Sequence, residues 1–135
     1  MDKRAIQQIP ILSLAYLGDA VWEILVRDHL VRKSRLQANQ LHQQATHYVK
    51  AAGQARIMQE WLDRPNWLKA EELTIFKRGR NAKSHTSAKN ASIADYRLAT
   101  GFEALFAYLY LGDEPKRYQE LSESALAIIE EDLHV

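Results

Sequence analysis

"SLAYLGDAVWEILVRDHL", residues 13–30, has the apolar spacing of a buried helix, but its middle holds two residues that such helices rarely contain. Gly18 weakens a helix interior by about 1 kcal/mol relative to alanine. Asp19 places a carboxylate in the same apolar stretch. Because burying an unpaired carboxylate is costly, Asp19 needs a cation, a hydrogen-bond network or a wet cleft. The apolar face expected of this helix consists of Leu14, Leu17, Val21, Ile24, Leu25 and Val31.

The remainder of the chain repeats the helical spacing and contains no convincing run of alternating apolar residues, so the sequence predicts an all-α fold. Pro65 and Gly79 are expected to end helices, and Ser92 followed by Asp95 resembles a helix-capping arrangement. Gly53 weakens any helix that runs through it, so residues 36–62 are expected to form two helices or one bent helix. The other expected helices span residues 11–31, 69–77, 92–111 and 116–131.

Length and composition limit the class of protein. With 135 residues, 47% of them hydrophobic, the chain suffices for one compact core, so we expect a single domain over residues 1–135. No cysteine is present, which excludes disulfides and thiolate metal sites and fits a reducing compartment; cytoplasm is the default expectation. No run approaches the roughly 18 to 20 apolar residues of a membrane span, so no membrane association is expected.

The basic residues are concentrated in one segment. "KRGRNAKSHTSAKN", residues 77–90, holds five lysines or arginines and no acid, whereas the rest of the chain has 13 basic and 17 acidic residues, a net charge of −4. Its serine, threonine and asparagine content predicts a loop. A local basic patch is a candidate contact for phosphates. The alternative is a solvated flexible loop without a ligand.

A second carboxylate, Glu103, lies in the strongly apolar stretch "GFEALFAYLYL". Two explanations for Asp19 and Glu103 are open. One is an internal salt bridge, with Arg27 or Arg97 as the partner. The other is a divalent metal shared between two helices, for which hard oxygen ligands suit Mg²⁺ or Mn²⁺. Glu23, one helical turn after Asp19 on the same face, would then be a further ligand or a hydrogen-bonding neighbour of the ligands.

Three segments in order, "AYLGDAVWE" at 15–23, "KRGRNAKS" at 77–84 and "YRLATGFEALFAYLYL" at 96–111, resemble the ribonuclease III family, and most closely its compact bacterial group, the Mini-ribonucleases III. The resemblance covers nearly the whole chain. It implies an all-helical endonuclease domain, a homodimer, and Mg²⁺-dependent hydrolysis of double-stranded RNA, with Mn²⁺ as a possible substitute. It also implies trimming of precursor large-subunit ribosomal RNA.

The resemblance assigns the two embedded carboxylates to catalysis. Asp19 matches the family's signature aspartate and Glu103 the glutamate of its second acidic motif, so both are expected to hold the metal. Larger ribonucleases III have carboxylates where this chain has Ala15 and Thr100, which implies a two-carboxylate site and leaves the number of metal ions open. Thr100, one turn before Glu103, could orient a metal-bound water. The alternative function is a helical dimer that binds structured RNA without cutting it.

The resemblance also implies where RNA and a second subunit bind. Larger members carry a separate double-stranded RNA-binding domain, and none is expected here. The basic segment is therefore expected to bind the RNA. Tyr16 matches an aromatic residue at the family's two-fold interface, which predicts a homodimer. The residues expected to contact RNA phosphates or sugar hydroxyls are Lys77, Arg78, Arg80, Asn81, Lys83, Ser84 and Lys89.

Overall fold

The computed structural model describes residues 1–83 and 92–133, and all regular secondary structure within them is helical. The all-α prediction is therefore confirmed. No helix in these ranges combines the length and the apolar character needed to cross a membrane. The helices are α1 (Lys3–Gln7), α2 (Ile11–Lys33), α3 (Ala38–Val49), α4 (Ala51–Asp63), α5 (Ala70–Asn81), α6 (Ile93–Leu111) and α7 (Pro115–Leu133).

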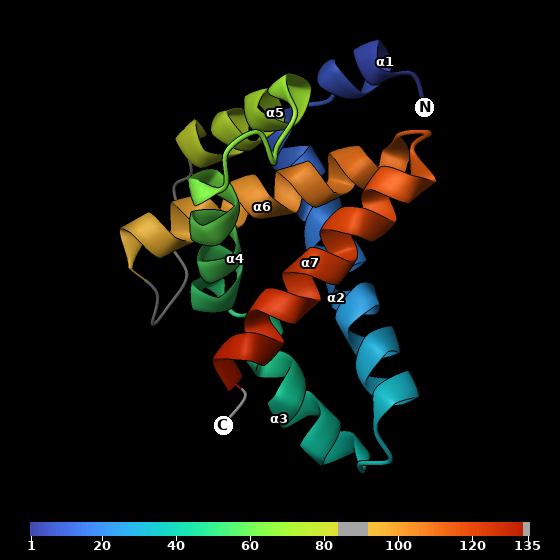
Figure 1. The fold of residues 1–135 in the computed structure, drawn as a ribbon. Coiled ribbons are helices and arrows are strands. Elements are labelled where there is room, and N and C mark those ends of the chain that lie inside the picture. Colours follow the sequence, from blue (N-terminus) through green and yellow to red (C-terminus); the bar gives the residue numbers. More distant parts are fainter. Residues whose placement is uncertain (84–91, 134–135) are drawn as a thin grey trace.

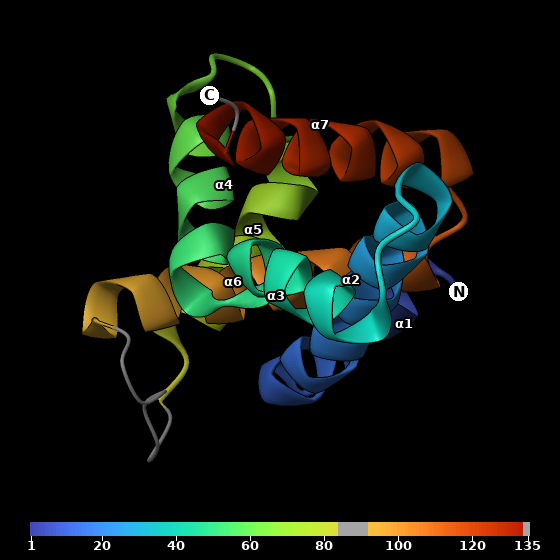
Figure 2. The same ribbon diagram turned by 90° about the horizontal axis from the view of Figure 1, so that it is seen from below.

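Helix α6 is the centre of the fold. Its residues 99–102 and 104–109 are buried, which matches a sequence that is apolar nearly all round. It packs most extensively against α2, α5 and α4 (Figure 1). In the view from below, α7 lies on one side of α6 and the N-terminal part of α2 on the other (Figure 2). A polar residue in the buried part of α6 is therefore held among several helices.

Aromatic side chains fill the core where α2, α4 and α6 meet. Trp22 and Trp61 are buried, and the rings of Phe102 and Phe106 lie 4.8 Å apart between them. Trp22 meets Phe102 edge-on at 5.0 Å, a favoured aromatic geometry. These tryptophans stabilise the core and are not available to stack on bases.

Several helix ends lie where the sequence places them. The Ser92 side chain accepts a hydrogen bond from the Asp95 backbone N–H, as the capping pattern predicts, and α6 ends at Gly112. Residues 36–62 form two helices, which separate at the extended residue Lys50. Gly53 therefore lies in the first turn of α4 and not inside a long helix.

The end of α5 differs from the prediction. Gly79 does not stop this helix, which continues to Asn81. A Cβ atom at Gly79 would lie 2.8 Å from the Gly101 Cα atom, so the glycine is needed for the close approach of α5 to α6. The prediction of a loop beyond Lys77 is thus wrong for Arg78, Arg80 and Asn81, all of which are helical.

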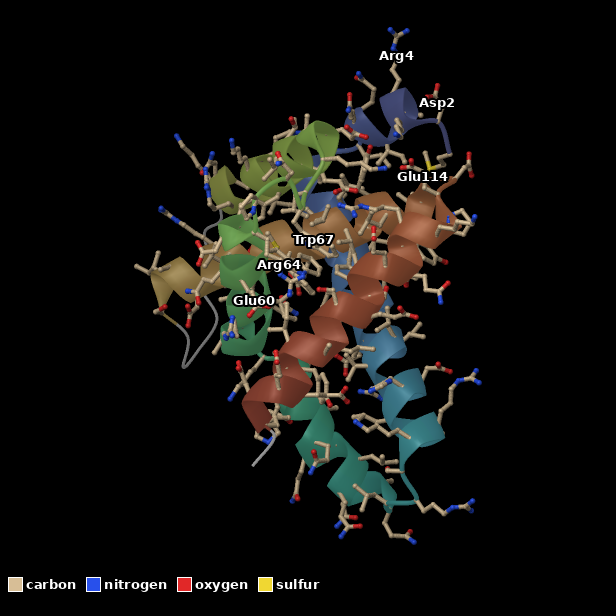
Figure 3. The ribbon with its side chains drawn as sticks, in the orientation of Figure 1. Asp2, Arg4, Glu60, Arg64, Trp67 and Glu114 are labelled. Atoms are coloured by element: carbon tan, nitrogen blue, oxygen red, sulfur yellow. The ribbon has the colours of Figure 1, made fainter. Side chains whose placement is uncertain are left out.

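The connection from α4 to α5 contains the predicted break at Pro65. Asn66 follows it with φ 59°, a left-handed conformation that asparagine tolerates better than most residues. The Arg64 guanidinium lies 5.0 Å from the centroid of the Trp67 ring and also pairs with Glu60 (Figure 3). The ion pair with Glu60 holds the connection against α4.

Helix α1 was not expected from the sequence. The Asp2 side chain accepts a hydrogen bond from the Arg4 backbone N–H and so caps it (Figure 3). Ile6 is fully buried, and the Met1 ammonium group donates to the Leu111 carbonyl at the end of α6. A five-residue helix is too short for its sequence pattern to stand out, so tertiary contacts decide its presence.

Candidate active site

Helices α2 and α6 cross with their backbones in contact at Gly18. A Cβ atom at this position would lie 1.7 Å from the Glu103 carbonyl oxygen, far inside any possible contact. Glycine is therefore required here, which explains why the middle of α2 accepts a residue that weakens a helix. The crossing brings Asp19, the next residue of α2, beside Glu103 of α6.

The two carboxylates repel each other in a partly buried site. Burial is the main cause that raises the pKa of Glu103 to about 8, and the charge of Asp19 and its hydrogen bond to Glu103 act in the same direction. A hydrogen bond from Gln54 acts in the opposite sense and favours the charged form of Glu103. Asp19 itself is exposed, so the pair lies at the boundary between core and solvent.

The salt-bridge explanation for this pair is wrong. Arg27 forms an ion pair with Glu23, at 2.9 Å between Nη2 and Oε1, and Arg97 is exposed. Over residues 1–83 and 92–133, neither Asp19 nor Glu103 has a basic group within 4.0 Å. The pair therefore has no compensating cation among the described side chains.

The donor set fits a divalent cation. Two adjacent carboxylates without a basic partner supply the hard oxygen ligands that Mg²⁺ and Mn²⁺ prefer, and a cation would remove their mutual repulsion. Across the described part of the chain, no group of three or more histidine, aspartate or glutamate side chains could hold a metal. The arrangement is thus a two-carboxylate pair, in which other ligands have to come from water or a bound phosphate.

Thr100 lies three residues before Glu103 on α6, and Gln54 contacts Glu103 from α4. The hydroxyl of Thr100 donates to the Tyr96 carbonyl at 3.0 Å, so only its lone pairs remain for another group. Gln54 of α4 is 1% exposed, and its Nε2 atom lies 3.5 Å from Glu103 Oε2. Sequence reasoning missed Gln54; a glutamine among the small and apolar residues of "AAGQARIM" was the available signal.

Comparison with known proteins identifies the family. The model of the ribonuclease III domain matches residues 12–114, which include both carboxylates. This chain belongs to the ribonuclease III family. It is 51% identical to Mini-ribonuclease 3 of Enterococcus faecalis over 118 residues, covering 87% of this chain and 89% of that protein. It is 45% identical to Mini-ribonuclease 3 of Clostridium tetani over 130 residues, covering 96% of this chain and 84% of the relative.

A solved structure supports the same conclusion about the fold. The crystal structure of a protein from Fusobacterium nucleatum superposes with a TM-score of 0.77 at 28% identity. The match covers 94% of this chain and 97% of the other. The helical arrangement around α6 is therefore the fold of the ribonuclease III domain.

The basic residues of this ribonuclease III domain divide into two sets. Helix geometry places Lys77, Arg80 and Asn81 on one face of α5, where Arg80 donates to the Asn81 side chain and lies over the Phe76 ring. Arg78 instead donates to the Gln7 carbonyl of α1 at 3.2 Å, so it holds two helices together. Lys83 is exposed just beyond α5, and Ser84 and Lys89 lie outside the described residues.

The outer side of α2 in this ribonuclease III domain exposes large apolar side chains. Tyr16 is 85% exposed, Ile24 69%, Val31 61% and Leu12 43%, with the charged residues Asp19, Glu23 and Arg27 among them. Large apolar side chains that are exposed together on one helix face mark an interaction surface. The broad apolar character of α2 thus has two causes, because one face packs on α6 and the other lies open.

Proposed function

We propose that this chain hydrolyses double-stranded RNA in a Mg²⁺-dependent reaction at Asp19 and Glu103, acts as a homodimer in the cytoplasm, and matures precursor large-subunit ribosomal RNA. Membership of the ribonuclease III family makes it a double-strand-specific endoribonuclease. One observation carries the metal assignment: two carboxylates from α2 and α6 lie side by side without a cationic partner. Mn²⁺ is expected to substitute for Mg²⁺ because both accept hard oxygen ligands.

The protein's role in this reaction is to hold a divalent cation at a fixed position with two carboxylates. Asp19 and Glu103 would hold the metal through their carboxylate oxygens once Glu103 has lost its proton. A divalent metal held there would supply the positive charge that favours ionised water, stabilises the leaving oxygen and neutralises the phosphate. The contact between Gly18 and the Glu103 backbone fixes the spacing of the two ligands, because neither helix can shift without disturbing the core.

RNA binding is assigned to the exposed face at the end of α5. Lys77, Arg80 and Lys83 contact phosphates of the duplex, and Asn81 is available for a sugar hydroxyl; Ser84 and Lys89 extend this set. Gly79 packs α5 against Gly101, two residues before Glu103 on α6, so the basic face and the carboxylate pair belong to one rigid unit. Duplex RNA is recognised mainly through phosphates and 2′-hydroxyls, so weak sequence preference is expected.

The homodimer is assigned to the exposed face of α2. Tyr16, Leu12 and Ile24 would be covered by the same face of a second copy, which is the isologous contact of a two-fold dimer. A dimer presents two carboxylate pairs, one for each strand of a duplex. The ribosomal RNA substrate rests on the likeness to the compact bacterial group.

Replacing each carboxylate by its amide tests the metal assignment. Asp19→Asn and Glu103→Gln keep the size of the side chain and remove its charge, so cleavage of a labelled RNA duplex in Mg²⁺ should fall by at least about 10²-fold, the size of effect expected when a metal ligand is lost. Duplex binding should persist, because the basic face of α5 is untouched. Asp28→Asn is the matched control, since it removes an exposed carboxylate of the same helix that pairs with Arg32. Near-normal cleavage by either amide variant, or binding without cleavage by the unmodified protein in Mg²⁺, would contradict the proposal.

A further inference from the structure

Gln54 is a polar side chain in a place suited to an apolar one. It is 1% exposed and lies on α4 beside the buried residues Ala55, Ile57 and Met58. Its Oε1 atom is buried and has no hydrogen-bond partner among the described residues. An unpaired buried amide oxygen costs free energy, whereas methionine or leucine would fill the same space without that loss. The hydrogen bonds made by its Nε2 atom therefore have to explain the choice of glutamine.

The amide group of Gln54 has a defined orientation. Its Nε2 atom donates to the Val49 carbonyl at 3.1 Å, and that carbonyl can only accept. The same nitrogen lies 3.5 Å from Glu103 Oε2, so its second hydrogen is available to the carboxylate. The Val49 carbonyl at the end of α3 thus fixes which end of the amide faces Glu103.

We propose that Gln54 is a positioning residue, which holds the Glu103 carboxylate in the orientation in which Glu103 and Asp19 bind the divalent cation. This inference rests on the proposed metal site. The arrangement joins three helices at one point: α2 brings Asp19, α6 brings Glu103, and α4 brings the amide that orients the Glu103 carboxylate. Gln54 touches neither RNA nor metal; it acts through Glu103. Its buried Oε1 atom faces no described hydrogen-bond donor, so Nε2 is the atom through which it acts.

The experiment measures binding of Mn²⁺ alone to the protein by electron paramagnetic resonance, without RNA. Gln54→Met keeps the volume of the side chain and removes both donors, so Mn²⁺ affinity should fall 10- to 100-fold, as is typical when the hydrogen-bond partner of a metal ligand is lost. Ile57→Val, on the same face of α4, is the matched control for lost packing and should bind Mn²⁺ like the unmodified protein. The KM for duplex RNA should stay within twofold in Gln54→Met, because the basic face of α5 is unchanged.

The outcomes separate this inference from the proposed function. If Glu103→Gln loses Mn²⁺ binding while Gln54→Met binds as tightly as the unmodified protein, the positioning role is wrong and the metal site stands. If Glu103→Gln binds Mn²⁺ normally, or the unmodified protein does not bind it, the metal site is wrong and the positioning role falls with it.

A second measurement covers a Gln54→Met variant that does not fold. In the unmodified protein, the side-chain amide signals of Gln54 should shift in the ¹⁵N spectrum on addition of Mg²⁺, and they should not shift in Glu103→Gln. Amide signals of Gln54 that do not shift on addition of Mg²⁺ to the unmodified protein would overturn the positioning role.

Discussion

Gly18→Ala is the most demanding test of the helix crossing that builds the site. The added Cβ atom would lie 1.7 Å from the Glu103 carbonyl oxygen, and real Cβ contacts essentially never fall below 3.0 Å. The two helices must therefore separate locally by about 1.3 Å, the difference between these distances. The obstacle is backbone, which cannot rotate aside as a flexible side chain can.

The expected cost follows from two opposing effects. Overpacking a core costs about 1–3 kcal/mol, and a backbone obstacle belongs at the upper end of that range. Alanine in place of glycine returns about 1 kcal/mol of helix propensity. The net loss is about 2 kcal/mol, which lowers Tm by roughly 6–10 °C in a domain of this size. A misplacement of about 1 Å at the carboxylate pair should also lower cleavage about 10²-fold.

Thermal unfolding by circular dichroism and cleavage of a labelled duplex measure the two effects. Gly112→Ala is the matched control, because the nearest atom to its added Cβ, the Tyr108 carbonyl oxygen, lies at 3.2 Å and the position is at the end of α6. That variant should stay within about 1 kcal/mol of the unmodified protein. Gly18→Ala with unchanged Tm and unchanged cleavage would refute the view that contact at Gly18 sets the spacing of Asp19 and Glu103.

Three further predictions address the pH dependence of stability, RNA binding and dimerisation. Between pH 4.5 and about 8 the folded state keeps a proton on Glu103 that the unfolded chain has lost, so the free energy of unfolding of the metal-free protein should fall as the pH rises through this range. Urea unfolding in EDTA measures this fall, and Glu103→Gln should remove it. The double change Arg80→Ala and Lys83→Ala should weaken duplex binding and reduce the slope of log K against log salt by about 2, whereas the control Lys116→Ala, an exposed residue of α7, should change neither. An unchanged slope in the double variant would exclude the α5 face as the RNA-binding surface. Tyr16→Glu should convert a dimer into a folded monomer in sedimentation at micromolar concentration, and a monomeric unmodified protein would contradict the assigned α2 interface.

The helices and the candidate carboxylates could be predicted because both are local properties of the chain. A spacing of three and four residues defines a helix face wherever it occurs, and Ser92 and Gly112 end α6 through contacts within a few residues. Asp19 and Glu103 stood out because each interrupts an apolar run, and the cost of burying a charge does not depend on knowing the partner. The sequence by itself thus determined the helical class and indicated the two carboxylates of the candidate site.

Tertiary structure decided what each unusual residue meets. Gly79 was expected to end a helix, but α5 continues because the glycine admits the backbone of α6, and so the basic residues form a helix face. Gln54 and Arg78 act on α6 and α1, which lie 49 and 71 residues away along the chain. The reason is physical: periodicity and capping depend on neighbours in sequence, whereas close approach and orientation of a side chain depend on which distant helix arrives beside it. Gly18 illustrates both kinds of information. The sequence shows it as an unusual residue in the middle of a helix, and only the structure shows why it is there, because the Glu103 backbone packs directly against it.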